Sequence, residues 1–316
     1  MLRLGLLFGG RSAERKVSLA GAMEVEKALD KNRYEVHRYD AATDIPRLVA
    51  DAADLDCVFI LLHGRYGEDG TVQGMLELLE LPYQGSGVLG SALAMDKHLS
   101  KVTYRASGIP TPDWLHVDRA SRPGDAEIVE KIGLPFIVKP CNQGSSVGIK
   151  IIKAREEAKT AIQEAFKWDS EIIAEKFITG REITGGVIGL DDLKALPIVE
   201  IIPDPEKYKF FDYEAKYKKG ATKEICPAEL PEETARKAQK IAIKAHRALK
   251  LSGYSRTDMI IDESGQIFAI ETNTIPGMTP TSLFPQAAAA AGLDFSSLID
   301  RLVEMAMQRS WKEDRI

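Results

Sequence analysis

The chain has 316 residues, of which 44% are hydrophobic and 28% charged, and its net charge is −5. This composition is typical of a globular protein that buries a sizeable core in two or three domains. Because binding to nucleic acid normally requires a basic face, the negative charge argues against nucleic acid as the main partner. No apolar run reaches the roughly 20 residues of a membrane helix, so no membrane partner is expected either.

Three cysteines, at positions 57, 141 and 226, show no Cys-x-x-Cys spacing. This pattern predicts neither a disulfide framework nor a zinc site, and a reducing cytoplasm is the expected location. The apolar residues 1–8 are followed by Gly-Gly-Arg-Ser rather than by the rest of a signal peptide, so they are interpreted as a first strand.

The N-terminal third has the pattern of an α/β unit. A buried strand at residues 2–8 ends at Gly9-Gly10 and is followed by a helix to about residue 31, and further strands are expected at 36–39 and 57–62. The loops after such strands are the usual ligand sites of open α/β sheets. A nicotinamide-dependent oxidoreductase is disfavoured, because Gly9-Gly10 lacks the three-glycine spacing. Later helices are expected at 71–79 and at 91–107, the second ending in a Gly/Pro linker.

Residues 136–176 follow the order strand, glycine loop, strand, helix, strand, which predicts a small second domain. The backbone of the loop Gln143–Gly148 could approach phosphate oxygens, since glycine permits close contact. Its spacing matches neither a P-loop nor a dinucleotide fingerprint, and an ordinary hairpin loop is the alternative. Lys139 and Lys97 favour phosphate binding, and Lys139 ends an apolar strand where an unpaired charge would be costly.

Residues 256–273 predict two apolar strands joined at Ser264-Gly265. A two-residue turn would place Asp258 directly opposite Glu271, and strand alternation would put Asn273 on the same face. Opposed carboxylates destabilise a sheet unless something neutralises them. Oxygen ligands of this kind suit Mg²⁺ that bridges to phosphates, and a solvated strand end is the alternative.

Two further segments suggest a binding function. Residues 171–178 form an apolar stretch interrupted by charge, which is typical of an interdomain hinge whose backbone bonds an adenine edge, and Glu182 could accept ribose hydroxyls. The alternative for these charged residues is an ordinary exposed surface. Strands are expected at 182–188 and 194–202, and a helix at 232–249. The polar loop 203–227 between them is long enough to be a lid.

Taken in order, the motifs of the chain closely resemble those of the D-alanine–D-alanine ligase family, which are ATP-grasp enzymes of bacterial cell-wall synthesis. The departures are Ser255, Cys141-Asn142 and Thr272, none of which removes a charged functional position. The motifs are Gly9-Gly10-x-Ser12-x-Glu14, His63-Gly-x-x-Gly67-Glu68-Asp69-Gly70, Met95-Asp96-Lys97, Val138-Lys139-Pro140, Gly144-Ser145-Ser146-Val147-Gly148, Glu214-Ala215-Lys216-Tyr217, Arg256-x-Asp258 and Glu271-x-Asn273-Thr-x-Pro276-Gly277-Met278-Thr279.

The resemblance implies an α/β fold of the ATP-grasp type with an N-terminal Rossmann-like (pre-ATP-grasp) domain. The expected domains are residues 1–95 for substrate binding, 96–182 for the small ATP-grasp domain, and 183–316 for the metal site and lid. The implied reaction phosphorylates the carboxylate of one D-alanine with ATP, and the amine of a second D-alanine attacks the acyl phosphate to give D-alanyl-D-alanine for peptidoglycan. A cytoplasmic homodimer is usual in the family.

The resemblance also implies roles for individual residues. Two Mg²⁺ ions are expected, with Mn²⁺ and an additional monovalent cation left open. Arg256 and the N–H of Gly277 would stabilise the oxyanion, and Glu14, assisted by Ser145 and Tyr217, would bind the first D-alanine's ammonium. The remaining implied contacts are Lys97, Lys139, Ser146, Glu175, Lys176, Ile178 and Glu182 for ATP, Asp258, Glu271 and Asn273 for the metal, and His63, Ser282 and Leu283 for the substrates.

Simpler roles and rival functions stay open. Arg256 could form a structural salt bridge, Glu14 could merely favour a helix N-terminus, His63 could be structural, and Ser282 could be only a helix cap. A ligase that uses D-lactate often lacks the tyrosine that Tyr217 provides. Another carboxylate–amine ligase of the ATP-grasp type is a further alternative. A non-catalytic nucleotide-binding module would be expected to lose Arg256 or a metal ligand, and neither is missing.

Overall fold

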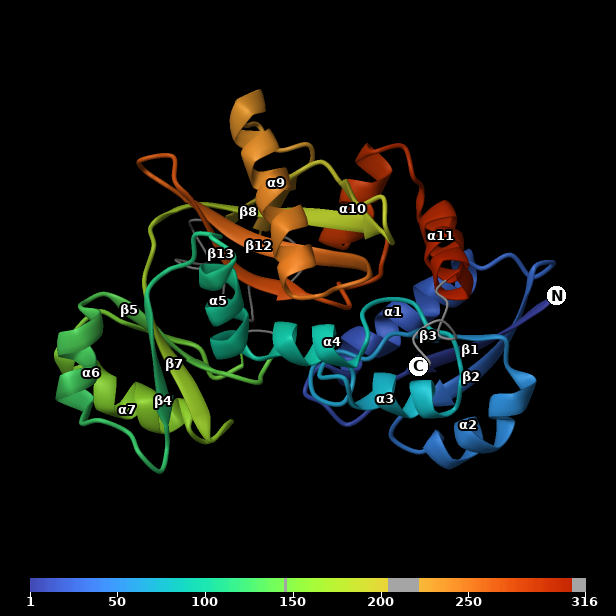
Figure 1. Cartoon of the computed structure of the whole chain (residues 1–316), viewed down its shortest axis with the longest axis horizontal. Helices are drawn as coiled ribbons and strands as arrows, with labels where there is room; N and C mark the ends of the chain where they lie inside the picture. Colours follow the sequence, from blue (N-terminus) through green and yellow to red (C-terminus); the bar gives the residue numbers. More distant parts are fainter. Residues whose placement is uncertain (145–146, 204–221, 309–316) are drawn as a thin grey trace.

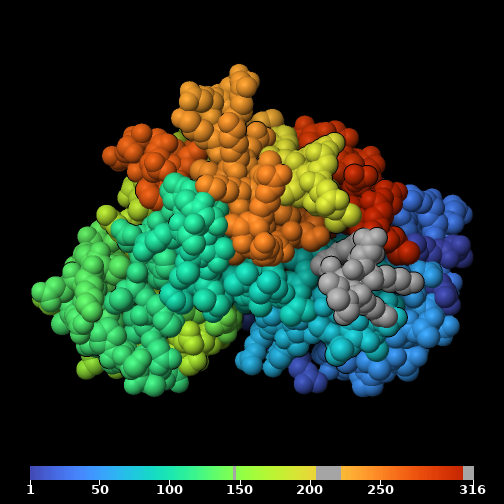
Figure 2. Space-filling model, viewed as in Figure 1, coloured from blue at the N-terminus to red at the C-terminus, as the bar shows by residue number. Residues whose placement is uncertain are grey.

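The computed structural model describes residues 1–144, 147–203 and 222–308. Three separate β-sheets organise this part of the chain, one parallel and two antiparallel, with helices packed on each of them (Figure 1). The expected α/β fold is confirmed. Figure 2 shows an indentation on this face between the green lobe, which contains the four-stranded sheet, and the blue N-terminal lobe.

The first sheet has the strand order β2–β1–β3, and all three strands are parallel. Its central strand is almost continuously apolar because helices cover both faces of a parallel sheet. The elements are β1 (Leu2–Phe8), α1 (Arg15–Ala28), β2 (Tyr34–Asp40), α2 (Ile45–Asp51), a 3₁₀ turn (Ala52–Asp54), β3 (Cys57–Ile60) and α3 (Thr71–Leu78).

The second sheet is four-stranded and antiparallel, in the order β4–β7–β5–β6. Helices α6 and α7 pack against it and form its apolar core (Figure 1). The sequence analysis identified neither β4 nor α6, because both follow a Pro-rich segment and their apolar patterns are short. The elements are β4 (Trp114–Asp118), α6 (Asp125–Ile132), β5 (Phe136–Pro140), β6 (Lys150–Ile152), α7 (Arg155–Ala165) and β7 (Glu171–Lys176).

The third sheet has the order β11–β10–β8–β12–β13, with β9 paired to β8. Helix α9 packs on β8 and β12, whereas α10 and α11 share a core with α1 and β1, so the end of the chain packs back on its beginning (Figure 1). The elements are β8 (Gly180–Gly189), β9 (Lys194–Ala195), β10 (Val199–Pro203), β11 (Thr222–Ile225), α9 (Glu232–Ala248), β12 (Gly253–Asp262), β13 (Ile267–Asn273), α10 (Leu283–Ala290) and α11 (Phe295–Gln308).

The single helix predicted over 91–107 is wrong. The chain forms two helices there, α4 (Val88–Met95) and α5 (Lys97–Ala106). Asp96 breaks the helix because it takes an extended backbone and its carboxylate accepts a hydrogen bond from Leu99 N at 2.9 Å, which starts a new helix. Lys97 therefore begins α5, and its N–H donates to the Cys141 carbonyl at 3.1 Å.

Two predictions for the segment before α9 also need correction. The strand expected over 194–202 is divided into β9 and β10. The segment 203–227 is not entirely a loop, because its later part forms β11, antiparallel to β10. Residues 204–221 of the expected lid lie outside the described residues. Within the described part of the chain, no helix is long and apolar enough to cross a membrane.

Candidate active site

The acidic hairpin of β12 and β13 pairs Asp258 with Glu271, as predicted, but the predicted two-residue turn is wrong. Asp262 N instead bonds Gln266 O at 3.0 Å, which leaves the three residues 263–265 in the turn, with Gly265 in a left-handed conformation at φ 82°. A bulge beside Asp258 then moves the pairing by one residue. The two one-residue displacements cancel, so the acidic pair is opposed for a different reason than the one predicted.

Arg256 lies on the same strand as Asp258 and binds it with two hydrogen bonds, both 2.8 Å long. Thr184 Oγ1 donates to Asp258 Oδ1 at 2.7 Å, and Asn273 Nδ2 lies 3.3 Å from Asp258 Oδ2. The salt bridge considered for Arg256 is therefore present. A divalent cation fits this oxygen-rich set of two carboxylates and one amide, and it would compete with the guanidinium for the oxygens of Asp258.

Lys97 joins the hairpin to the glycine loop. Its Nζ lies 3.7 Å from Glu271 Oε2 and donates to the carbonyl oxygen of Gln143 at 2.5 Å. A small cavity of about 30 Å³ lies at this junction, with space for about one water molecule. Its lining comes from β13, α4, α5 and two loops, through Glu68, Ala94, Met95, Lys97, Gln143, Gly144, Glu271, Thr272, Asn273 and Thr274. The structure thus brings Lys97 and the start of the glycine loop to the expected metal residues.

Lys139 lies in apolar surroundings, where its charge requires a counter-ion, and Glu175 provides one. Lys139 Nζ lies 2.6 Å from Glu175 Oε1. The other oxygen of Glu175 lies 2.6 Å from Lys101 Nζ, and Lys101 is completely buried. Burial lowers the pKa of Lys101 to about 8, although Glu175 opposes the change. Burial alone would raise the pKa of Glu175, but the two lysine charges outweigh it and lower that pKa.

The sequence analysis did not identify Lys101 as important. Lys101 lies four residues after Lys97 on α5, hence on the same helix face, and this spacing was the available signal. Its Nζ also donates to Thr111 Oγ1 at 2.7 Å and to the Pro112 carbonyl at 3.2 Å. Lys101 therefore connects α5, the chain entering the small sheet, and the buried end of β7.

The other residues expected at the nucleotide lie where the chain passes from the second sheet to the third. Lys176 ends β7 and is exposed, Ile178 is half-buried in the connection, and Glu182 is half-buried on β8. The N–H of Lys176 donates to Asp113 O at 2.8 Å. The segment has the interdomain position expected of a hinge, and its contact with adenine stays a prediction. Ser145, Ser146 and Tyr217 lie outside the described residues.

Three titratable side chains, Glu14, His63 and Glu68, are buried near the ends of β1 and β3. Glu14 precedes α1 but makes no capping hydrogen bond with its side chain. Its Oε2 approaches the backbone of Gly64 and Gly144 so closely that a Cβ added to either glycine would lie 2.6 or 2.5 Å from it. Glu14 therefore lies directly beneath the start of the glycine loop.

Burial and the charge of Glu14 raise the pKa of Glu68 to about 8. Glu68 nevertheless accepts hydrogen bonds from Gly64 N at 2.7 Å and Ile275 N at 3.3 Å. Burial also lowers the pKa of His63 to about 4, and the Arg256 charge adds to this effect, so His63 is neutral at pH 7. Glu68 belongs to a motif identified from the sequence but was given no role there.

The loop between β13 and α10 carries the remaining predicted residues. Ser282 occupies the cap position of α10 but does not cap it with its side chain, and it contacts Thr279 Oγ1 at 2.8 Å instead. A Cβ added to Gly277 would lie 3.2 Å from Ser282 Oγ, so these residues are close neighbours. Leu283 begins the helix and is half-buried.

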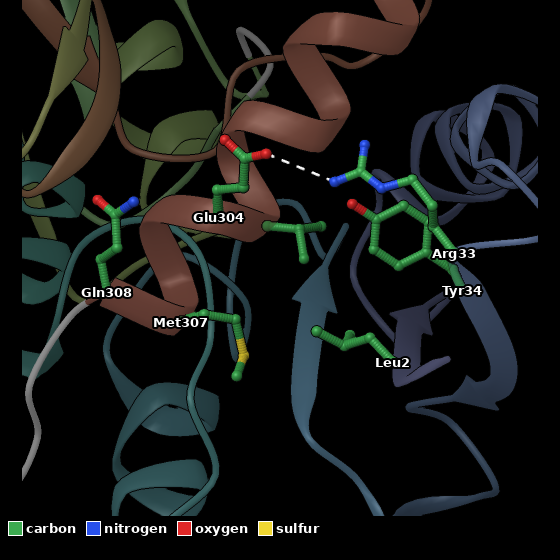
Figure 3. Close-up of a pocket in the computed structure, with 7 residues that line it drawn as sticks. Leu2, Arg33, Tyr34, Glu304, Met307 and Gln308 are labelled. Carbon is green, nitrogen blue, oxygen red and sulfur yellow. Dashed lines mark hydrogen bonds and ion pairs between the residues drawn. The ribbon is translucent and has the colours of Figure 1, made fainter.

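A larger cavity of about 310 Å³ lies away from these residues, between the start of the first sheet and the end of α11 (Figure 3). Arg33 and Glu304 face each other across it at 3.4 Å. Its lining residues are Leu2, Arg33, Tyr34, Val303, Glu304, Met307 and Gln308. It contains none of the predicted site residues, so the acidic hairpin and its surroundings are the candidate active site.

The raised pKa of Glu68 predicts a pH-dependent stability. Its stabilising proton is fully bound below the usual pKa of about 4.5 and is lost as the pH rises towards about 8. Glu68→Gln has no such proton to lose, so from pH 5 to pH 8 it should gain at least about 1.4 kcal/mol in unfolding free energy relative to wild type, equivalent to one pKa unit. Urea unfolding at both pH values measures this, with the exposed Glu263→Gln as control. Parallel profiles for wild type and Glu68→Gln would contradict it.

Because Lys101 and Lys139 share the buried carboxylate of Glu175, removal of Lys101 is expected to lower the stability of the fold. Lys101→Met should lower the unfolding free energy by on the order of 3 kcal/mol, because it leaves Glu175 buried with one cation fewer. The double variant Lys101→Met/Glu175→Gln should recover part of this loss, since it removes the uncompensated charge. Urea unfolding measures both, and the exposed Lys159→Met is the matched control. Equal stability of the Lys101 and Lys159 variants would refute the interpretation.

Comparison with known proteins identifies the family. Residues 103–304 match the family model described as D-ala D-ala ligase C-terminus, and residues 40–86 match that of the D-ala D-ala ligase N-terminus. The D-alanine–D-alanine ligase of Desulfotalea psychrophila is 54% identical over 98% of this chain and 96% of its own length. The enzyme of Syntrophobacter fumaroxidans is also 54% identical, over 97% of this chain and 98% of its own.

Solved structures agree with these sequence matches. The Bacillus anthracis D-alanine–D-alanine ligase complexed with ATP superposes with a TM-score of 0.86 at 38% identity, covering 99% of this chain and 100% of that one. The VanG D-Ala:D-Ser ligase of Enterococcus faecalis has a TM-score of 0.83 at 31% identity, covering 96% and 99%. The resemblance inferred from the motifs and the expected ATP-grasp fold are both confirmed, and the chain belongs to the D-alanine–D-alanine ligase family.

Proposed function

We propose that this chain joins two D-alanine molecules into D-alanyl-D-alanine at the expense of ATP, for peptidoglycan synthesis. The observation that carries the proposal is the convergence of Lys97, Glu271 and the glycine loop at one cavity. Arg256 and Asp258 lie beside them on the strand paired with that of Glu271. Transfer of a phosphoryl group between anions requires charge neutralisation and alignment more than covalent assistance. This junction provides both.

Asp258, Glu271 and Asn273 are proposed to hold two Mg²⁺ ions, which neutralise the ATP phosphates when bound. In the described structure Asp258 is instead engaged by Arg256. A cation held by Asp258 would compete with this salt bridge, and the Arg256 guanidinium would then be available to a substrate oxygen. Arg256 would then stabilise the oxyanion together with the N–H of Gly277. Mn²⁺ is a candidate to replace Mg²⁺, and a monovalent cation is a further candidate.

Lys97 and Lys139 are proposed to contact the phosphates of ATP. Lys139 is held in place by Glu175, which Lys101 holds in turn, so its ammonium is oriented before ATP binds. Lys97 already contacts the start of the glycine loop, through Gln143. Ser146 of that loop, Lys176, Ile178 and Glu182 complete the proposed nucleotide contacts.

Glu14 is proposed to bind the ammonium of the first D-alanine, with Ser145 and Tyr217 assisting. Neutral His63 is proposed to contact the same substrate. An ammonium group bound here would favour the ionised forms of both Glu14 and Glu68. It would therefore lower the pKa of Glu68, which would release its proton when the substrate binds. Ser282 and Leu283, at the start of α10, would hold the carboxylate of the second D-alanine. The segment 203–227 would exclude water from the acyl phosphate.

Because one similar structure is a D-Ala:D-Ser ligase, the identity of the second substrate has to be tested. The presence of Tyr217, a tyrosine that D-lactate ligases often lack, favours D-alanine over D-lactate as this substrate. We further propose that the protein acts in the cytoplasm as a homodimer, as is usual in the family. Size-exclusion chromatography with light scattering measures the oligomeric state. The domain boundaries proposed from the sequence, at residues 95 and 182, stay predictions.

Phosphate release from ATP tests the function. We expect Mg²⁺-dependent release with D-alanine and a product with the mass of the dipeptide, and little release with L-alanine, D-serine or D-lactate. Glu271→Gln should lower kcat at least about 100-fold, because it removes one metal-binding charge, whereas Glu263→Gln at the tip of the same hairpin should not. If phosphate release does not depend on any of the four compounds, the chain would be another carboxylate–amine ligase.

Tyr217→Ala tests the proposed lid. It should reduce kcat by about tenfold or more, because water and misaligned substrate then reach the acyl phosphate. The affinity for ATP, measured by calorimetry without D-alanine, should stay near that of wild type. A large loss of ATP affinity would contradict the assignment of Tyr217 to the first amino acid rather than to the nucleotide.

A further inference from the structure

A mixed cluster of potential metal ligands lies at one end of the four-stranded sheet. His116 on β4, Cys141 just after β5 and Glu171 at the start of β7 each offer one ligand atom, and these atoms all lie within 4.8 Å of one another. The strands are neighbours in the order β4–β7–β5, and Cys141 N donates to Glu171 O at 3.0 Å. The pairing of three adjacent strands therefore fixes the backbone of the cluster.

The side chains of the cluster are held in different ways. His116 Nε2 lies 2.8 Å from Glu171 Oε2, and both groups remain partly exposed. The ring of His98 stacks on that of His116, with 4.2 Å between centroids, and His98 Nδ1 accepts a hydrogen bond from Trp114 Nε1 at 3.0 Å. The thiol of Cys141 is fully buried beneath them. The imidazole is thus fixed, and solvent reaches the cluster from the His116 and Glu171 side.

We propose that His116, Cys141 and Glu171 form a binding site for a thiophilic divalent metal ion such as Zn²⁺. Nitrogen, sulfur and carboxylate oxygen are the ligand types that zinc takes in proteins, whereas the all-oxygen hairpin suits Mg²⁺. Three protein ligands leave a fourth position for water. The site is separate in chemistry and in location from the acidic hairpin.

The geometry requires only small adjustments. With metal–ligand bonds of about 2.0–2.3 Å in a tetrahedron, neighbouring ligand atoms lie roughly 3.3–3.6 Å apart. His116 and Glu171 would separate by about half an ångström from their present 2.8 Å, and the thiol would move towards them. Binding releases the proton of the Cys141 thiol to solvent, and the ion takes its place. Burial raises the pKa of the Cys141 thiol, and the charges of Asp96 and Asp169 raise it further, whereas the charge of Lys97 opposes them. The two carboxylates favour a cation at the thiol.

The position of Cys141 links this site to the glycine loop. Cys141 lies two residues before the loop, and its carbonyl accepts the N–H of Lys97 at 3.1 Å. A bound metal would pin the base of the loop and reduce its freedom to accommodate ATP. This consequence rests on the proposed function, whereas metal binding itself does not.

Equilibrium dialysis of the full chain against Zn²⁺, with saturating Mg²⁺ and no ATP, tests the site. We expect one Zn²⁺ per chain, and at least a tenfold loss of affinity in Cys141→Ser and in His116→Gln. Co²⁺ should give a thiolate-to-metal charge-transfer absorption in wild type that Cys141→Ser lacks. Cys226→Ser is the matched control, because it removes a thiol that contacts Gln286 O, remote from the cluster. Circular dichroism verifies that each variant is folded.

The proposal is overturned if folded Cys141→Ser and wild type bind Zn²⁺ equally, if Mg²⁺ displaces the ion, or if no Zn²⁺ is retained. A second measurement concerns ATP. Zn²⁺ should raise the KM for ATP severalfold in wild type and Cys226→Ser but not in Cys141→Ser. A site that binds Zn²⁺ without changing KM would leave the metal site intact and refute its effect on the loop. Absence of ligase activity would refute the proposed function without affecting the dialysis result.

Discussion

The apposition of Asp258 and Glu271 across a hairpin is the constraint on which the site depends. Two carboxylates directly opposite each other on adjacent strands repel, so the surrounding structure has to supply positive charge. Arg256 and Lys97 supply it from β12 and from the start of α5. A site whose carboxylates require cations is suited to bind metal ions together with a polyphosphate. The metal ions neutralise the carboxylates and the phosphates at the same time.

The same principle organises the two other buried charge groups. Glu175 is stable in the interior because two lysines share its carboxylate, and this arrangement orients Lys139. Glu68 is stable beside Glu14 because it retains a proton, and a cation bound next to the two carboxylates would favour release of that proton. The lysines around Glu175 therefore present positive charge, which suits a phosphate. The carboxylates of Glu14 and Glu68 attract positive charge, which suits an ammonium group.

The sequence predicted much of the site, and its failures have physical causes. The pairing of Asp258 with Glu271 was predicted, but the Asx turn at Asp262 and the compensating bulge were not, since both depend on hydrogen bonds that turn-type preferences do not resolve. Lys101 was missed because local pattern does not show which lysine of an amphipathic helix is buried. The grouping of Cys141 with His116 and Glu171 cannot be predicted from spacing, because these residues are distant in sequence and meet only through the order of three strands.

The cavity at the junction of the acidic hairpin and the glycine loop is much smaller than a nucleotide. Small-molecule sites typically measure about 300–1,000 Å³, so the about 30 Å³ described here cannot hold a nucleotide. The chain enters the small sheet near Thr111 and leaves it after Lys176, and the buried Lys101–Glu175 pair lies between these two crossings. Because α5 packs on the third sheet while Glu175 belongs to the second, this pair joins the lobes where the chain crosses between them. A rotation of the lobes about this pair would enlarge the junction while the buried charges stay paired.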